Sequence, residues 1–220
     1  LRQTDGTLIS ESETIRALCF DSKERLWIGS STKGVLLMNK QRQISHQLRD
    51  SAAGNVNELP SVWINSIAED KNGNMWVGTL RGTCIVNAAT LNITRLEKHP
   101  LLAPIARAAC NKLWRDKNGF MWIATTRGVW CYDELRNTLQ HYNTESGLIS
   151  NMVLAVNEDT TGSYYFGTAE GLSVLSTNGK FTNYNRTNGL RNNRCEGIIR
   201  DAEGFIWIGN LSCILRFDPG

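Results

Sequence analysis

The chain has 220 residues, of which 41% are apolar, and its formal net charge at pH 7 is +3. It can bury a large core, and neither this small charge nor the scatter of its basic residues favours a nucleic-acid partner. There is no initiating methionine, no signal peptide and no apolar run near the roughly 18–20 residues that cross a bilayer, so we expect an excised piece of a longer protein.

A ten-residue stretch from Asp70 to Thr79 has relatives at four other places in the chain. Each copy begins with an aspartate and carries an aromatic residue six positions later. The aspartates are Asp21, Asp70, Asp116, Asp159 and Asp201, and the aromatic residues are Trp27, Trp76, Trp122, Tyr165 and Trp207. Successive aspartates are 49, 46, 43 and 42 residues apart. This period is typical of propeller blades or solenoid units.

Within a copy, Asp-x-x-Gly between two apolar runs predicts a tight hairpin turn in which glycine takes a positive φ. The first copy has Glu24 in place of the glycine, so we expect a strained turn there, or one of another type. Three consecutive apolar residues follow each turn, as in Met75-Trp76-Val77, which indicates a strand buried on both faces.

Another strand is predicted before each aspartate, always with an aliphatic residue three positions before it. These runs are Ile15 to Phe20, Ile64 to Ala68, Cys110 to Trp114, Val153 to Val156 and Cys195 to Ile199. A third apolar run such as Val35 to Met38 and a more polar fourth run such as Thr138 to Tyr142 complete most copies. Each copy is therefore predicted to be a four-stranded meander, although the last stops before its fourth strand.

A small sheet with two apolar faces is unstable alone, and radial stacking buries both faces. Burial of one large side chain contributes about 1.5–3 kcal/mol. We therefore predict an all-β fold with almost no helix, a β-propeller segment of about five four-stranded antiparallel blades. The predicted single domain covers residues 1–220, with repeats at about 12–60, 61–105, 106–148, 149–190 and 191–220. A helical repeat is excluded because no stretch sustains apolar spacing of three and four.

The six cysteines are predicted to lie inside strands as small buried apolar residues, in preference to disulfides or metal ligands. They are Cys19, Cys84, Cys110, Cys131, Cys195 and Cys213. They form no Cys-x-x-Cys pair, and the three histidines His46, His99 and His141 are not grouped with them. We therefore predict no metal site and no cofactor.

The fullest copy of the motif runs from Gly189-Leu190 through Asn193 and then from Ile198 to Gly209. The linker pattern Gly-Leu-x-x-Asn appears again from Gly147 to Asn151. This pattern resembles the two-component regulator propeller repeat, and the likeness extends over essentially the whole chain. Departures are Ala124 for a glycine of the third copy, Tyr165 for tryptophan in the fourth and Cys213 for glycine in the fifth.

The resemblance implies an extracytoplasmic, periplasmic sensor of a hybrid two-component system, of the kind with which gut Bacteroidetes detect oligosaccharides. In that family two seven-bladed propellers precede a β-sandwich, a membrane helix and a histidine kinase. The implied partners are an oligosaccharide or other small ligand, the remaining blades and domains of the parent, and a second copy in a full-length dimer. The implied mechanism is a shift in domain or dimer arrangement relayed through the membrane.

Binding residues are expected where the copies differ, on the loops at one end of the sheets. In the turn after the aromatic strand, the residue before glycine is Lys33, Arg81 or Arg127 in the first three copies. We call these three the cationic arc. Such an arc suits carboxylated or sulfated sugars through bidentate guanidinium bonds, and the alternative is a set of solvated turn residues.

The residue seven positions before the aspartate is aromatic only in the second copy, where it is Trp63. An indole there can stack on a sugar face and donate its N–H to a hydroxyl. The alternative is that Trp63 packs under the preceding loop, Asp50 to Pro60. Further candidates for binding hydroxyls are Asn65, Arg107, Asn151, Asn193 and Arg194.

Two other functions stay open at this point. A propeller hydrolase or lyase needs carboxylates or histidines facing the channel, but the recurrent aspartates are expected to be occupied by their own turns and the histidines to lie in outer strands or loops. We therefore predict no enzymatic activity for this segment. A protein-interaction scaffold predicts an exposed apolar patch.

Overall fold

The computed structural model describes residues 13–50, 57–210 and 212–217, and these form two compact units, 1–115 and 116–220. Every sheet is antiparallel, and its strands follow one another in sequence order. Among the described residues there are five sheets, four with four strands and the last with three, and the helices are two short 3-10 turns. The all-β meander is thereby confirmed.

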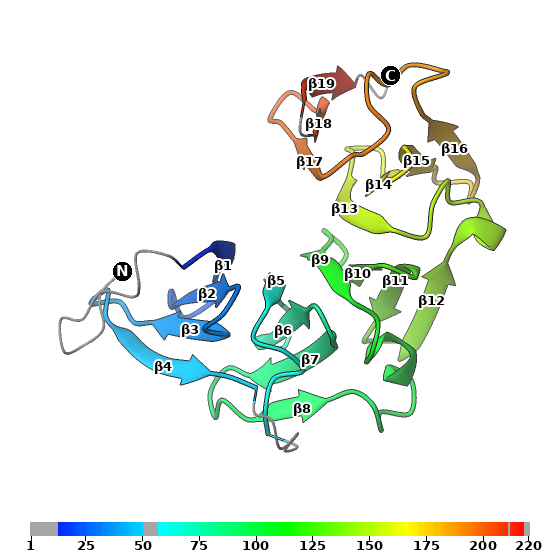
Figure 1. Ribbon diagram of the computed structural model, residues 1–220. Helices are drawn as coiled ribbons and strands as arrows, with labels where there is room; N and C mark the ends of the chain where they lie inside the picture. The colour runs from blue at the N-terminus through cyan, green and yellow to red at the C-terminus, as the bar shows by residue number, and fades with distance from the viewer. Residues whose placement is uncertain (1–12, 51–56, 211, 218–220) are drawn as a thin grey trace. The chain divides into compact units, whose positions relative to one another are not determined.

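Figure 1 labels the strands of both units. Unit 1 holds β1 (Ile15–Phe20), β2 (Leu26–Ser30), β3 (Val35–Met38), β4 (Ile44–Leu48), β5 (Ile64–Glu69), β6 (Asn74–Thr79), β7 (Gly82–Asn87), β8 (Ile93–Arg95), η1 (Ala103–Ile105) and β9 (Cys110–Arg115). Unit 2 holds β10 (Met121–Thr125), β11 (Gly128–Asp133), β12 (Thr138–Tyr142), η2 (Thr144–Ser146), β13 (Val153–Glu158), β14 (Tyr164–Thr168), β15 (Leu172–Leu175), β16 (Phe181–Tyr184), β17 (Gly197–Arg200), β18 (Ile206–Gly209) and β19 (Ile214–Phe217).

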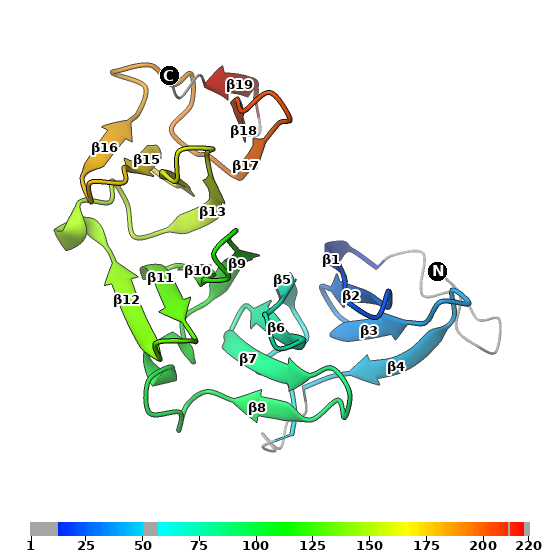
Figure 2. The same cartoon turned by 180° about the vertical axis from the view of Figure 1, so that it is seen from behind.

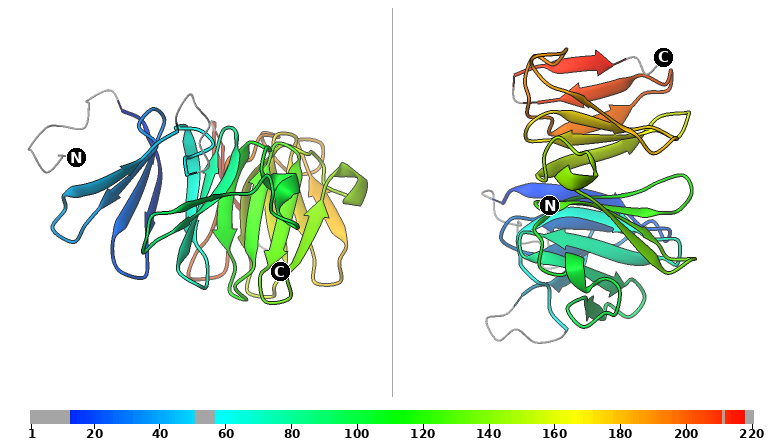
Figure 3. Two further views of the ribbon diagram at one scale, coloured as in Figure 1. Left: turned by 90° about the horizontal axis from the view of Figure 1, so that it is seen from below. Right: turned by 90° about the vertical axis from the view of Figure 1, so that its right-hand side faces the viewer.

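The first strands of successive sheets lie side by side within each unit. In unit 1, β5 contacts the first strands β1 and β9, and in unit 2, β13 contacts the first strand β17 and also β10, the second strand of the preceding sheet. Figure 2 shows β1, β5 and β9 on one side of unit 1 and β4 and β8 on the other. The side views of Figure 3 show the turns of each sheet at its two opposite ends. The loops that precede the first strands therefore gather at one end of each unit.

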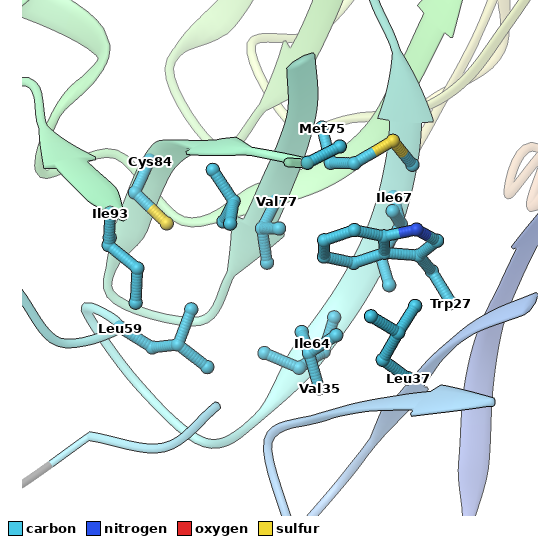
Figure 4. Close-up of a cluster of buried hydrophobic side chains, with 12 residues drawn as sticks. Trp27, Val35, Leu37, Leu59, Ile64, Ile67, Met75, Val77, Cys84 and Ile93 are labelled. Carbon is cyan, nitrogen blue, oxygen red and sulfur yellow. The ribbon is translucent and has the colours of Figure 1, made fainter. Parts of the chain in front are cut away.

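The core of unit 1 lies between its first two sheets. Trp27, Val35 and Leu37 of the first sheet form one buried cluster with Ile67 and Val77 of the second. Figure 4 shows these side chains pointing toward one another from the two sheets. The apolar triplets that predicted strands buried on both faces thus supply the packing between sheets.

The recurrent aspartates hold the Asp-x-x-Gly turns and the aromatic residues together. In the second copy, Asp70 Oδ1 accepts from the N–H groups of Asn72 and Asn74, both at 2.9 Å, and Oδ2 accepts from Trp76 Nε1 at 3.1 Å. The same bond to the aromatic residue recurs in Trp27, Trp122 and Trp207, at 2.9, 3.0 and 2.6 Å. In the fourth copy the hydroxyl of Tyr165 takes the place of the indole N–H, at 3.1 Å. This bond explains the constant spacing of six.

The structure decides two details of the sequence-based prediction: it confirms the strained turn at Glu24, and it contradicts the placement of two cysteines inside strands. Glu24 does adopt the positive φ of the missing glycine, 61°, so its turn keeps the same type under strain. Cys195 and Cys213, however, lie just outside strands rather than inside them, because the first strand of the last copy begins at Gly197 and its third at Ile214. All six cysteines are free, and burial raises the pKa of Cys84 and Cys110 to about 12.

The turn aspartates predict how stability depends on pH. Burial raises the pKa of Asp21, but hydrogen bonds from Trp27 and Arg25 outweigh this effect, so its pKa is lowered. The hydrogen bond from Trp207 likewise lowers the pKa of Asp201. A carboxyl with a lowered pKa in the folded state contributes stability that is present above its unfolded pKa of about 3.9 and is lost as pH falls through its folded pKa.

We therefore expect the urea midpoint to stay constant from pH 7 to about pH 5 and to fall steeply below about pH 4. An Asp21→Asn variant is the control, because it lacks one of these titrating groups and its midpoint should fall less over the same range. A wild-type midpoint that is unchanged down to pH 3 would contradict this role of the aspartates.

Candidate functional site

A β-bulge changes the direction of one side chain on the first strand of three of the sheets. The pairing register shifts between Ile15 and Ala17 in β1, and at the equivalent place in β5 and β13. The residues at these bulges, five positions before the aspartate, are Arg16, Asn65 and Leu154. Bulges of this kind commonly orient side chains at binding sites.

In unit 1 the bulge residues of two neighbouring sheets meet at Trp63. Asn65 Oδ1 accepts from Arg16 Nε at 3.1 Å and from Trp63 Nε1 at 3.0 Å, and Asn65 Nδ2 donates to the carbonyl oxygen of Cys110 at 2.9 Å. The Arg16 guanidinium carbon lies 5.0 Å from the centroid of the Trp63 ring, a cation–π contact. We call Arg16, Trp63 and Asn65 the rim triad.

The rim triad presents an indole and a guanidinium to solvent. Trp63 is 38% exposed, and Arg16 is also exposed. Among the described residues, no carboxylate forms an ion pair with Arg16. The indole N–H is occupied by Asn65, so stacking on the ring and charge pairing with Arg16 are the interactions that this group offers a ligand.

Two more predicted residues lie close to the rim triad in unit 1. The backbone N–H of Leu80 donates to the carbonyl oxygen of Trp63 at 3.1 Å, which places the turn holding Arg81 beside the indole. A Cβ added to Gly82 would lie 3.4 Å from the Cα of Arg107, so the backbone of Arg107 passes along the same turn. Arg81 and Arg107 are both exposed.

The turns that hold Arg81 and Arg127 of the cationic arc make the same hydrogen bond as the equivalent turn of the fourth copy. The hydroxyls of Thr79, Thr125 and Thr168 accept from the backbone N–H two residues later, at 3.1, 3.0 and 3.1 Å. Those N–H groups belong to Arg81, Arg127 and Glu170. Lys33 and Arg81 belong to unit 1 and Arg127 to unit 2, so the arc itself stays a prediction.

The candidate asparagines of unit 2 have a structural role in the linkers. Asn151 Oδ1 accepts from the backbone N–H of Thr144 at 2.9 Å, and Asn193 Oδ1 accepts from that of Arg186 at 2.8 Å. Both bonds reach seven residues back and close the Gly-Leu-x-x-Asn linker. Arg194 donates through Nε to Glu196 at 2.7 Å, so its charge already has a partner. A ligand contact for these residues stays a prediction.

A small polar hollow lies at the opposite end of β1 and β5 from Trp63. Its volume is about 180 Å³, and its lining includes Asp21, Arg25 and Glu69. The Glu69 carboxylate accepts from the backbone N–H of Ser22 at 2.9 and 3.0 Å, and Asp21 is held by its own turn. These carboxylates therefore hold the first turn against the second sheet.

The three histidines do not lie with the carboxylates of the polar hollow. His46 lies on β4 and His141 on β12, each the fourth strand of its sheet, and His99 follows β8. Within the described ranges, no three histidine, cysteine or acidic side chains are placed to hold a metal ion. In the same part of the chain, no helix is both long and apolar enough for a membrane span.

Arg16 is the site residue that sequence reasoning missed. The position seven before the aspartate singles out Trp63, but Arg16 lies at the position five before it. That position reads Arg16, Asn65, Asn111, Leu154 and Glu196, and it is polar in four of the five copies on an otherwise apolar strand. This polarity was the available signal.

Comparison with known proteins supports the same type of repeat. The family model of the two-component regulator propeller matches residues 10–32 and 58–81. Comparison with curated protein sequences gives no match.

Solved structures with the same fold include sensor domains and an enzyme. The extracellular domain of a hybrid two-component system from B. thetaiotaomicron has a TM-score of 0.80 and 24% identity, over 97% of this chain and 29% of that one. A second such domain from the same organism has a TM-score of 0.75 and 21% identity, over 94% and 27%. A virginiamycin B lyase from Staphylococcus aureus has a TM-score of 0.69 and 12% identity, over 98% and 75%.

The chain spans less than a third of the length of the two B. thetaiotaomicron domains. At these identities, the likeness to solved structures establishes the fold. Residues 10–32 and 58–81 thus match the two-component regulator propeller repeat, within a chain that has the β-propeller fold.

Proposed function

We propose that this chain is a ligand-sensing propeller module in the periplasmic region of a hybrid two-component regulator, and that it responds to an oligosaccharide. The matched repeats and the likeness to extracellular domains of hybrid two-component systems support this role. The histidine kinase of such a regulator would lie elsewhere in the polypeptide.

The rim triad is the observation that carries the proposal. An exposed indole, fixed through its N–H by Asn65, offers a rigid apolar face suited to a sugar ring. The guanidinium of Arg16 beside it, without a carboxylate partner among the described residues, suits a carboxylate or sulfate on that sugar. Arg81 and Arg107 add positive charge along the neighbouring turn.

Such a module acts by binding and carries out no covalent chemistry. A ligand shifts an equilibrium between two arrangements only by the difference in its affinity for them. A tenfold preference for one arrangement is worth about 1.4 kcal/mol, which is enough to change the output of a poised regulator.

Isothermal titration calorimetry tests the proposal. The chain is titrated with a panel of neutral, uronic-acid and sulfated oligosaccharides. We expect saturable binding of an oligosaccharide and about tenfold or greater weakening in Trp63→Ala, because the stacking surface is lost. Combining Trp63→Ala with Arg81→Ala and Arg127→Ala tests the cationic arc and should weaken binding further.

The matched control is Trp114→Ala, which removes an indole from β9 outside the rim triad and should leave the affinity unchanged. Equal affinity in the wild type and the triple variant would contradict the proposed site. Cleavage of any sugar in the panel would favour the hydrolase or lyase alternative, and a panel without any binder would favour the protein-interaction scaffold.

A further inference from the structure

Four asparagines of the chain are each followed by a glycine, and all four are exposed. They are Asn72, Asn118, Asn178 and Asn188. Asparagine in this setting is open to deamidation, because glycine has no side chain that hinders attack by its backbone nitrogen on the asparagine side chain. Local sequence and exposure are alike at the four places, so hydrogen bonds and packing decide which asparagine reacts first.

The backbone nitrogen that attacks is held in the same way in three of these turns. Gly73, Gly119 and Gly179 each donate the N–H to the carbonyl oxygen three residues earlier, at 3.2, 3.0 and 2.8 Å. This hydrogen bond must open before the nitrogen can attack, and its opening is a similar requirement in each of the three turns. The surroundings of the asparagine side chain are therefore what distinguishes them.

The side-chain amides of Asn178 and Asn188 are held by hydrogen bonds. Asn178 Oδ1 accepts from the hydroxyl of Ser176 at 2.7 Å and from the backbone N–H of Lys180 at 3.0 Å. Asn188 uses both side-chain atoms, since Oδ1 accepts from a backbone N–H at 2.6 Å and Nδ2 donates to a backbone carbonyl oxygen at 2.9 Å. Attack by the glycine nitrogen requires the amide to turn away from these partners, so the bonds protect both side chains.

Asn118 lacks this protection. Its backbone N–H donates to Asp116 Oδ1 at 2.9 Å, but its side-chain amide makes no hydrogen bond within the described residues. A Cβ added to Gly119 would meet no described atom within 4 Å, so the space beside the reacting bond is open. The equivalent turn of the second sheet is more crowded, because Asn72 lines the polar hollow and a Cβ on the following glycine would lie 3.7 Å from Glu69 Oε1.

We propose that Asn118 is the residue at which this protein deamidates first, and that isoaspartate formed there loosens the turn of Asp116. The Gly119 nitrogen loses its proton and bonds to Cγ of Asn118, while the bond from Cγ to the side-chain nitrogen breaks and ammonia leaves. One water molecule from solvent then opens the resulting succinimide. Opening on one side leaves aspartate, and opening on the other leaves isoaspartate, in which the backbone continues through the side chain and is longer by one methylene.

The extra methylene falls inside the turn that Asp116 holds. Asp116 Oδ1 accepts from the backbone N–H groups of Asn118 and Phe120, both at 2.9 Å, and these two groups lie on either side of the lengthened link. The same carboxylate accepts from Trp122 and from Tyr164 of the following sheet. A turn that no longer fits Asp116 therefore weakens a contact between two sheets of unit 2.

Peptide mapping by mass spectrometry of protein aged at mildly alkaline pH tests the proposal, with isoaspartate distinguished from aspartate by electron-transfer fragmentation. In the folded chain we expect Asn118 to convert several times faster than Asn72, Asn178 or Asn188. In urea all four should convert at similar rates, because their local sequences are alike and the contacts of the folded state are gone. Equal or faster conversion of any of the other three in the folded protein would overturn the choice of Asn118, as would the same preference for Asn118 in urea.

The stability of the aged protein tests the effect on the turn. We expect the isoaspartate form, separated by chromatography, to unfold at a lower urea concentration than the unaged chain, and Asn118→Asp, which adds the charge without the methylene, to lose less. Asn118→Gln, whose longer side chain cyclises far more slowly, should keep its urea midpoint through the same ageing. An isoaspartate form with an unchanged midpoint would overturn the link to Asp116. Neither measurement involves oligosaccharide binding, so their failure leaves the rim triad unaffected.

Discussion

Replacement of Asp116 by alanine is expected to lower the free energy of unfolding by about 4 kcal/mol. The buried carboxylate accepts from the backbone N–H groups of Asn118 and Phe120, from Trp122 Nε1 at 3.0 Å and from the Tyr164 hydroxyl at 2.7 Å. Tyr164 belongs to the following sheet, so Asp116 joins two sheets of unit 2. Trp122 Nε1 would be left buried without an acceptor, at about 1–3 kcal/mol, and the half-buried Tyr164 would lose its hydrogen bond between the two sheets.

The matched control for this variant is Asp201→Ala. Asp201 accepts from its own turn and from Trp207, but no donor from another sheet is recorded for it among the described residues, and Trp207 is half-exposed. Urea unfolding followed by tryptophan fluorescence should show the larger loss of stability for Asp116→Ala. Equal losses in the two variants would mean that the bond from Tyr164 contributes nothing to stability.

Gly82→Ala is expected to cost about 3–5 kcal/mol, or to prevent the second sheet from folding. Gly82 has a φ of 133°, which L-residues rarely adopt, and a Cβ there would lie 1.8 Å from the carbonyl oxygen of Ala106. Relief of this clash requires movement of the backbone that leads into β9. The turn that positions Arg81 beside Trp63 would be displaced with it.

Gly73→Ala separates the effect of the clash from that of the dihedral angle. Gly73 also has a positive φ, 77°, but a Cβ there would meet nothing closer than Glu69 Oε1 at 3.7 Å. We expect a cost of about 1 kcal/mol for this variant, from the dihedral angle alone. Thermal unfolding of both variants, with circular dichroism at low temperature, measures the difference. A cost for Gly82→Ala no larger than that for Gly73→Ala would contradict the close approach of Ala106.

Much of the fold was predictable from the repeat because the residues of each turn determine its backbone conformation. Asp-x-x-Gly specifies a turn, and three apolar residues specify a strand buried on both faces, so the strands Ile15–Phe20 and Val35–Met38 have the predicted bounds. The spacing of six between aspartate and tryptophan was visible, but its cause, a side-chain hydrogen bond, needed coordinates. Tyr165 shows this cause most clearly, because a hydroxyl replaces the indole N–H.

The candidate site was only partly predictable. Trp63 and Asn65 stood out as departures from the repeat, but their bond to each other and the stacking of Arg16 depend on a bulge that the sequence pattern does not reveal. The burial of individual strand residues is likewise only partly predictable from the sequence. Leu18 and Ile67 are equivalent in sequence, yet one is exposed and the other buried, because burial depends on the neighbouring sheet.

Nuclear magnetic resonance of the seven indole N–H groups tests most directly whether a ligand binds at the rim triad. A Trp63→Phe variant assigns the Trp63 signal. During titration with the oligosaccharide that binds in calorimetry, we expect a saturable shift of the Trp63 signal, while the signals of the buried Trp27 and Trp76 stay in place. Saturable binding that leaves the Trp63 signal unmoved would contradict the assignment of the ligand site to the rim triad.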